Sequence, residues 1–223
     1  MNNTIAIIPV RGNSKRLPGK NMLPLNGIPL LEHSIRYAKE NTNLLDTILV
    51  STEDNQLKVF SEDLGVKVLD RPKHLASDTA TTMDVLKDVL QQLGDKTCTI
   101  VLLQATNPLR PKNLLREAIE LFEKGKADSL MTVSRNHQKF GKIVNNKYIP
   151  FNYTLGQRSQ DMEPLYFENG LLYIMRSDLI KQGKLMGDNH ISMIVNHPYA
   201  EVDIDTQEDL QYAHYVLTQF KEA

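Results

Sequence analysis

The 223-residue sequence has little cysteine and no long apolar segment. Its one cysteine, Cys98, excludes an intrachain disulfide, and its place in the apolar run 98–103 favours a buried structural thiol over a catalytic one. No apolar run approaches the roughly 20 residues that a helix needs to cross a bilayer. No N-terminal stretch has the pattern of a secretory signal. The sequence therefore predicts a cytoplasmic protein with no membrane partner.

An excess of charge of either sign is also missing. The sequence has 26 basic and 27 acidic side chains, a formal net charge of −1. It contains no basic run with interleaved aromatic residues, so we expect no nucleic-acid partner. With 41% hydrophobic and 24% charged residues, the composition is typical of a folded domain. The length predicts a single domain over residues 1–223.

Short apolar runs alternate with amphipathic segments along the chain. The runs are typical of strands buried on both faces of a sheet, and they cover residues 5–10, 47–50, 99–103, 129–133 and 171–175. The helical patterns lie around residues 30–38, 86–93, 114–122 and 207–220. Strands that alternate with helices indicate βαβ units. The sequence therefore predicts an α/β fold with a mostly parallel sheet.

Residues 136–169 break this pattern. The segment is polar, has no long helical period and lacks the glycine, serine or proline runs of a linker, so we interpret it as an insertion. Residues 141–149 are expected to form a hairpin that turns at Asn145 and Asn146. The aromatic residues of the insertion are typical of an interface, and they are Phe140, Tyr148, Phe151 and Tyr153.

The loop after the first predicted strand is the strongest functional signal. Residues 11–21 contain four basic residues, two glycines and no acid. In open α/β sheets, ligands bind beyond the carboxyl ends of the strands, where glycine lets backbone N–H groups approach an anion. Arg11 and Lys20 would supply full charges for a triphosphate. The loop matches neither a Walker A sequence nor G-x-G-x-x-G, because Ser14 and Asn21 depart from the first pattern.

Two carboxylates near the C-terminus suggest a cation site. In an extended segment, Asp203 and Asp205 project from the same face and repel each other unless a cation lies nearby. Mg²⁺ binds well to one or two carboxylates together with water and phosphate oxygens. The alternative is that Asp205 or Thr206 caps the last helix. Asp78 has two interpretations of equal weight: it caps the helix that starts near Thr81, or it contacts the ligand directly.

Several motifs together resemble the acylneuraminate cytidylyltransferases, which activate sialic acids with CTP. The first is I-I-P-V-R-G-N-S-K-R-L-P-G-K-N over residues 7–21. The others are R-P-x-x-L-A-x-D from Arg71, Q-A-T-N-P-L-R from Gln104, E-N-G-L-L-Y-I from Glu168 and D-I-D-T-x-x-D-L from Asp203. The family usually has glycine at position 13, and Asn13 is a small departure because asparagine tolerates a left-handed backbone better than most residues. It usually has Q-P-T-S-P-L-R in the third motif, so Ala105 and Asn107 also depart from it.

The resemblance implies a Rossmann-like nucleotidyltransferase fold that uses CTP and Mg²⁺. The implied reaction transfers CMP to the anomeric hydroxyl of a nonulosonic sugar acid, with N-acetylneuraminic acid as the first candidate. Legionaminic, pseudaminic and Kdo acids stay open as substrates, as does a nucleotide-binding module without catalysis. The resemblance further implies a homodimer formed through residues 136–169. The general base stays unassigned.

The resemblance also assigns roles to individual residues. Nucleotide contacts fall on Arg11, Gly12, Asn13, Ser14, Lys20, Asn21, Arg71, Ala80 and Thr82. Sugar contacts fall on Gln104, Thr106, Lys142, Arg158, Asn169 and Tyr173, with Arg158 the candidate for the sugar carboxylate. The implied catalytic residues are Arg11, Lys20, Asn21, Asp203 and Asp205. Asp203 and Asp205 are the implied metal ligands. Arg110 ends the third motif; the alternative to a role in the site is that it starts the following helix and pairs with a surface carboxylate.

Overall fold

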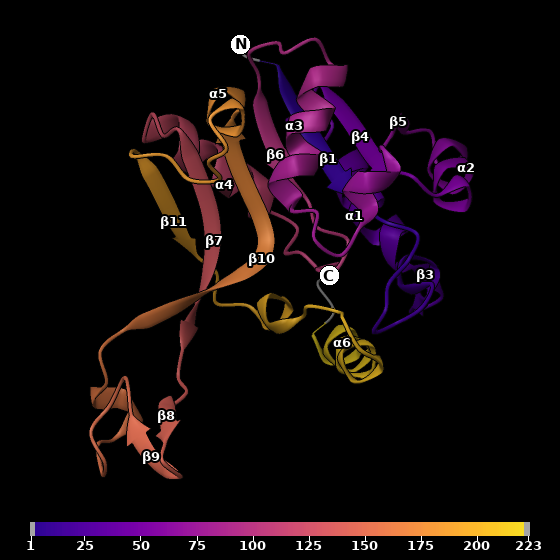
Figure 1. Cartoon of the computed structure of the whole chain (residues 1–223). Helices are drawn as coiled ribbons and strands as arrows, with labels where there is room; N and C mark the ends of the chain where they lie inside the picture. Colours follow the sequence, from indigo (N-terminus) through magenta and orange to yellow (C-terminus); the bar gives the residue numbers. More distant parts are fainter. Residues whose placement is uncertain (1–2, 221–223) are drawn as a thin grey trace.

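The computed structural model describes residues 3–220 and is built around one seven-stranded sheet (Figure 1). The strand order is β11-β7-β10-β6-β1-β4-β5. The strands are β1 (Thr4–Pro9), β4 (Thr47–Thr52), β5 (Lys67–Asp70), β6 (Thr99–Leu102), β7 (Ser129–Asn136), β10 (Leu165–Arg176) and β11 (His190–Ile194). Only β10 runs antiparallel to its neighbours, so the mostly parallel α/β prediction is confirmed.

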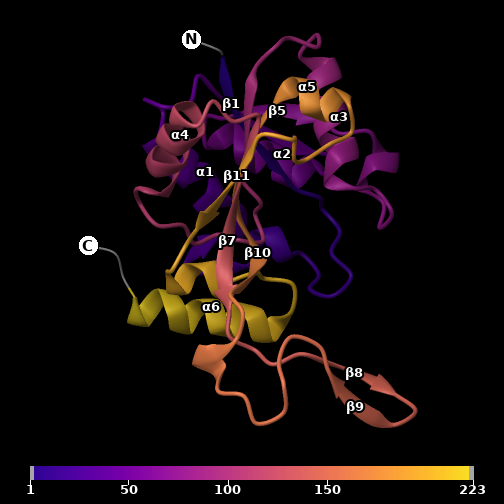
Figure 2. The same ribbon diagram turned by 90° about the vertical axis from the view of Figure 1, so that its left-hand side faces the viewer.

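Helices cover both faces of this sheet. They are α1 (Leu30–Glu40), α2 (Asn55–Asp63), α3 (Thr82–Gln92), α4 (Leu114–Lys124), α5 (Ser177–Lys181) and α6 (Gln207–Gln219). In Figure 2, α1 and α4 lie on one side of the sheet, and α3 and α5 lie on the other. The predicted apolar faces form the cores: Leu31 and Leu115 pack in one cluster, and Leu86 and Val89 pack in the other. Cys98 is buried, as predicted.

A third apolar cluster joins the first loop and the short strand β2 (Pro24–Leu25) to the last helix. Leu17 from the first loop and Leu25 from β2 pack with Leu210 and Ala213 of α6. Strand β2 pairs with β3 (Ile28–Pro29) in a small separate sheet. This packing holds the segment that precedes α6 against the first loop, although the two are far apart in the sequence.

The connections create a topological switch between β1 and β6. The chain passes from β1 to β4 and β5 on one side, then returns to β6 on the other side of β1. The loops that follow β1 and β6 therefore leave the sheet in different directions. In open α/β sheets, ligands bind in the crevice that forms at such a point.

Strands β7 and β10 continue beyond the body of the sheet as a two-stranded ribbon (Figure 1). The ribbon leads to the arm, which we define as residues 137–164 and which contains the hairpin of β8 (Gly141–Val144) and β9 (Lys147–Pro150). Asn145 and Asn146 turn the hairpin with φ of 50° and 60°, which confirms the predicted turn. Within residues 3–220, no helix combines the length and apolar character needed to span a membrane.

Candidate functional site

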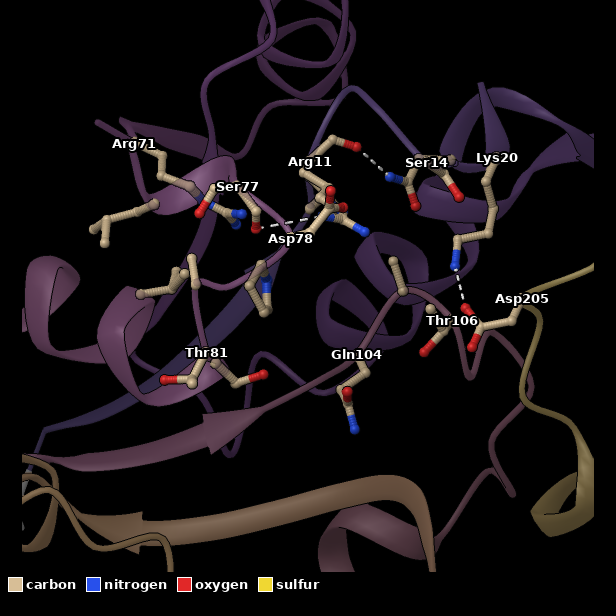
Figure 3. A pocket seen from close by; sticks show the side chains of 18 of the residues that line it. Arg11, Ser14, Lys20, Arg71, Ser77, Asp78, Thr81, Gln104, Thr106 and Asp205 are labelled. Atoms are coloured by element: carbon tan, nitrogen blue, oxygen red, sulfur yellow. Dashed lines mark hydrogen bonds and ion pairs between the residues drawn. The ribbon is translucent and has the colours of Figure 1, made fainter. Parts of the chain in front are cut away.

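A cavity of about 460 Å³ lies at the carboxyl ends of β1 and β6 (Figure 3). Loops from five parts of the chain line it: the loops after β1, β5 and β6, the start of α3 and the segment before α6. The predicted site residues among its lining are Arg11, Ser14, Lys20, Asn21, Arg71, Ala80, Thr82, Gln104, Thr106 and Asp205. Residues spread over almost 200 positions of sequence therefore meet in one cavity, at the crevice that the topology creates.

Close packing fixes the shape of the first loop. A Cβ atom added to Gly12 would lie 2.3 Å from Asp54 Oδ2, so only glycine fits there. Gly19 has a φ of 66°, which L-amino acids rarely adopt. Asn21 Nδ2 donates to the carbonyl oxygen of Arg11 over 2.8 Å and closes the loop on itself. Asn13, where the resembled family usually has glycine, is exposed and its φ is not positive, so this position does not require glycine.

Lys20 links this loop to the acidic segment before α6. The Lys20 side chain is only 10% exposed, and Nζ donates to Asp205 Oδ1 over 2.8 Å and to the carbonyl oxygen of Ile204 over 2.9 Å. Arg16, which is 67% exposed, pairs with the other oxygen of the same carboxylate. Figure 3 shows Lys20 and Asp205 pointing toward each other at one end of the cavity. Cationic groups of the loop thus stand directly beside a candidate metal ligand.

Asp78 also lines the cavity and pairs with the same loop. Arg11 Nη1 lies 3.1 Å from Asp78 Oδ1, and Lys15 contacts the other carboxylate oxygen. The hydrogen bond from Lys15 is the main cause of a lowered pKa for Asp78, and Arg11 adds to it. The hypothesis that Asp78 caps α3 is wrong. Thr81 is the N-cap, and it forms a reciprocal capping box with Asp84.

Arg71 forms part of the cavity floor and is almost fully buried, at 7% exposed. Its Nη2 donates to the carbonyl oxygen of Ser51 over 2.7 Å, and Nε donates to Ser51 Oγ over 3.3 Å. Burial lowers the pKa of Arg71, and the negative charge of Glu53 partly opposes that shift. Glu53 Oε1 also accepts the Gly12 amide over 2.8 Å. The sequence reasoning missed Glu53, although an acid at the end of a buried strand was a usable signal.

Arg110 holds the loop after β6 from within the protein. It is 6% exposed and donates to the carbonyl oxygens of Leu171 and Gln104, each over 2.7 Å, and to Ser34 Oγ over 3.0 Å. Burial lowers the pKa of Arg110 to about 10. The alternative that Arg110 pairs with a surface carboxylate is wrong. Instead, Arg110 fixes the backbone of Gln104 at the cavity wall.

The acidic segment alternates as an extended chain does. Val202 and Ile204 are buried, whereas Asp203 is exposed and Asp205 is half-buried. Thr206, and not Asp205, is the N-cap of α6. Desolvation by the surrounding protein raises the pKa of Asp203, although the residue is exposed. The nearby Thr106 side chain opposes the shift, and repulsion from Asp205 adds to it.

These carboxylates fit the donor set of Mg²⁺. Asp205 lines the cavity, whereas Asp203 does not. Because the two carboxylates repel each other, the pair is suited to a divalent cation whose other ligands are water and phosphate. Among residues 3–220, no group of three His, Cys, Asp or Glu side chains is arranged to hold a metal. Asp203 and Asp205 would therefore hold the ion together with the nucleotide rather than alone.

Two predicted sugar contacts are buried and do not line the cavity. Asn169 is 5% exposed, and its side chain accepts from Thr132 Oγ1 over 2.6 Å and donates to Ser134 Oγ over 3.0 Å. Tyr173 is also buried, and its hydroxyl donates to Glu168. Burial is the main cause of a raised pKa for Tyr173, and the Glu168 hydrogen bond adds to it.

Two more predicted sugar contacts lie in the arm. Arg158 pairs with Asp161, with Nε 2.7 Å from Oδ2. Lys142 lies over the ring of Phe151, with Nζ 5.5 Å from the ring centroid. Neither residue lines the cavity of its own chain. Figures 1 and 2 show the β8–β9 hairpin standing away from the body.

Comparisons with known proteins give a consistent result. A family model described as cytidylyltransferase matches residues 5–222. An N-acylneuraminate cytidylyltransferase of Streptococcus agalactiae serotype V is 32% identical over 219 residues, which cover 92% of this chain and 51% of that protein. The chain thus spans about half the length of this relative. A pseudaminic acid cytidylyltransferase of Campylobacter jejuni is 29% identical and is covered over 94% of both chains.

The fold also has solved counterparts. A CMP:2-keto-3-deoxy-manno-octonic acid synthetase complexed with CTP superimposes with a TM-score of 0.70 at 16% identity. The match covers 97% of this chain and 99% of that one. At this level of identity, the similarity establishes the shared architecture.

Proposed function

Because this chain belongs to the cytidylyltransferase family, we propose that it transfers CMP from CTP to the anomeric hydroxyl of a sialic-acid-type sugar acid. N-acetylneuraminic acid is the first candidate acceptor. The observation that carries the proposal is the single cavity in which Arg11, Lys20 and Arg71 converge with Asp205. Cations suit a triphosphate, and a carboxylate beside them suits the metal that accompanies it.

The proposed reaction is an in-line displacement. The hydroxyl oxygen of the sugar acid forms a bond to the α-phosphorus of CTP, the bond to the bridging oxygen breaks, and pyrophosphate leaves. The hydroxyl proton passes to water or to one of the two aspartates, which acts as the base. Arg11 and Lys20 stabilise the negative charge on the phosphates, and Asn21 holds the loop in place. Mg²⁺ bound by Asp203 and Asp205 would neutralise further phosphate charge.

A second candidate acceptor is pseudaminic acid. The Campylobacter jejuni relative that carries this name matches along almost the whole length of both chains, whereas the Streptococcus agalactiae relative is about twice as long. Legionaminic acid and Kdo complete the set of acceptors to test.

We also propose that the arm forms a homodimer with a second copy of the chain. Its apolar side chains are unusually exposed: Ile143 and Leu155 are each 70% exposed, and Phe151 is 67% exposed. An apolar surface of this kind favours association. In a dimer, Arg158 or Lys142 would reach the partner's cavity. Light scattering after size exclusion should give about twice the 25.4 kDa of the chain, and a monomer at micromolar concentration would contradict the proposal.

Pyrophosphate release tests the reaction. The assay combines the protein, CTP and Mg²⁺ with each of the four acids in turn, beside a blank without acid and the Asp205→Ala variant. Release that depends on one acid and is lost in the variant supports the proposal and identifies the substrate. Folded protein that binds CTP but releases nothing with any acid favours a non-catalytic nucleotide-binding module. Cytoplasmic location stays a prediction from the sequence.

A further inference from the structure

Asn107 is a residue of the third motif that the proposed chemistry does not use. It stands where the resembled family usually has serine, and it is 1% exposed. Its Nδ2 atom donates to two backbone carbonyl oxygens, that of Asn169 over 3.1 Å and that of Val202 over 2.9 Å. Its Oδ1 atom accepts from Thr106 Oγ1 over 3.1 Å. One carboxamide therefore joins the loop after β6 to two distant segments.

The first of these segments is an irregularity in β10. The pairing of β10 with β7 shifts register between Glu168 and Tyr173, and Gly170 in this stretch has a φ of 75°. A Cβ atom added to Gly170 would lie 2.7 Å from Asn107 Oδ1. The backbone of β10 thus approaches the Asn107 side chain as closely as glycine permits.

The second segment carries the candidate metal ligands. Asn107 holds the carbonyl oxygen of Val202, and the Ile204 amide donates to the carbonyl oxygen of Thr106 over 2.8 Å. These two bonds lie on either side of Asp203 in the sequence. Lys20 then holds the carbonyl oxygen of Ile204 from the opposite wall. The backbone around Asp203 is therefore fixed to the loop that also carries Gln104.

We propose that Asn107 is a positioning residue that sets the metal-binding carboxylates against the cavity wall. The inference rests on the proposed function, because it concerns the metal site of that reaction. A carboxamide nitrogen has two protons and donates to both carbonyls, whereas a serine hydroxyl has one proton and donates to a single acceptor. Asparagine at this position thus makes a connection that serine lacks.

The test is metal affinity in the Asn107→Ala variant. We expect Mn²⁺, measured by calorimetry on the protein–CTP complex without sugar acid, to bind about tenfold more weakly than in the unmodified protein. CTP affinity in the presence of a chelator should stay within about twofold of the unmodified protein, because the cationic side chains proposed to bind CTP do not contact Asn107. Equal weakening of CTP and Mn²⁺ binding, or no change in Mn²⁺ affinity, would overturn the proposal.

Asn41 supplies the matched control. It is a buried asparagine whose Nδ2 donates to the carbonyl oxygen of Tyr37 over 2.8 Å at the end of α1, away from the cavity lining. Asn41→Ala should leave Mn²⁺ affinity unchanged. A loss equal to that of Asn107→Ala would show a general effect of removing a buried amide, and would overturn the assignment.

A milder variant keeps the test decisive if Asn107→Ala does not fold. Asn107→Ser retains one donor and should weaken Mn²⁺ binding by a smaller factor, again with CTP affinity preserved. Unchanged Mn²⁺ affinity in folded Asn107→Ser would then contradict the inference. Pyrophosphate release is measured separately: its absence in the unmodified protein would remove the proposed reaction while leaving the Mn²⁺ comparison intact.

Discussion

Replacing Lys20 by methionine should both destabilise the fold and impair the reaction. The Lys20 ammonium is 10% exposed and donates to a carboxylate and to a backbone carbonyl. Hydrogen bonds to charged groups contribute about 1.5–3 kcal/mol, so we expect a loss of about 2 kcal/mol in the free energy of unfolding. For a domain of this length, that corresponds to a decrease of about 4–8 °C in Tm.

Arg16 offers a matched comparison, because it pairs with the same carboxylate of Asp205. Its side chain is 67% exposed, and exposed ion pairs contribute about 0.2–1 kcal/mol. Arg16→Met should therefore change Tm by no more than about 4 °C. Urea unfolding of both variants beside the unmodified protein measures the difference. Equal losses would refute the reasoning that burial makes the Lys20 contacts the stronger ones.

The kcat of Lys20→Met separates a catalytic role of Lys20 from a structural one. If Lys20 stabilises phosphate charge, kcat in Lys20→Met should fall by about 10²-fold, as when one preorganised donor is removed. The measurement is made below the Tm of the variant, with folding checked by circular dichroism. A kcat that stays within about threefold would place Lys20 outside the catalytic machinery and leave it with a structural role.

Three further predictions follow from the cavity. Gly12→Ala should weaken CTP binding by about tenfold or more in calorimetry, because the new Cβ meets Asp54; unchanged binding would contradict the packing. Asp203→Asn should raise the free energy of unfolding near neutral pH, because the pKa of Asp203 is raised in the folded state and its ionisation therefore destabilises the fold. In acid, where Asp203 is protonated, the variant should be no more stable than the unmodified protein. Stabilisation in acid alone would contradict the direction of the pKa shift. Asp78→Asn should tighten CTP binding by a few-fold at low salt, and the gain should shrink at high salt; salt-independent binding would refute an electrostatic origin.

Much of the fold was predictable because buried parallel strands leave a strong local pattern. The apolar runs that contain Ile7, Val101 and Ile174 are all central strands. Strand β11 was missed because it lies at the sheet edge, where alternating exposure leaves only a short pattern. Helix α2 was missed because it buries only Leu57 and Ser61, so its apolar face is too narrow to detect.

The candidate site was predictable in part for a different reason. Loop residues such as Arg11 and Lys20 carry a compositional signal, and the topology brings them to one cavity. The burial of Arg110 was not predictable, because its partners Ser34 and Leu171 are distant in the sequence. The positions of Lys142 and Arg158 in the arm were not predictable, because the local sequence does not show in which direction a protruding hairpin points.

The ion pairs of the cavity also bear on how an anion arrives. Lys15 and Arg11 share Asp78, and Arg16 and Lys20 share Asp205, so each pair of cations is partly neutralised before any phosphate approaches. Long-range attraction depends on uncompensated charge, whereas local exchange of partners does not. Two cations that share one carboxylate keep one net positive charge, so nucleotide capture should still slow as salt is raised, with selectivity arising as phosphate oxygens replace the two aspartates.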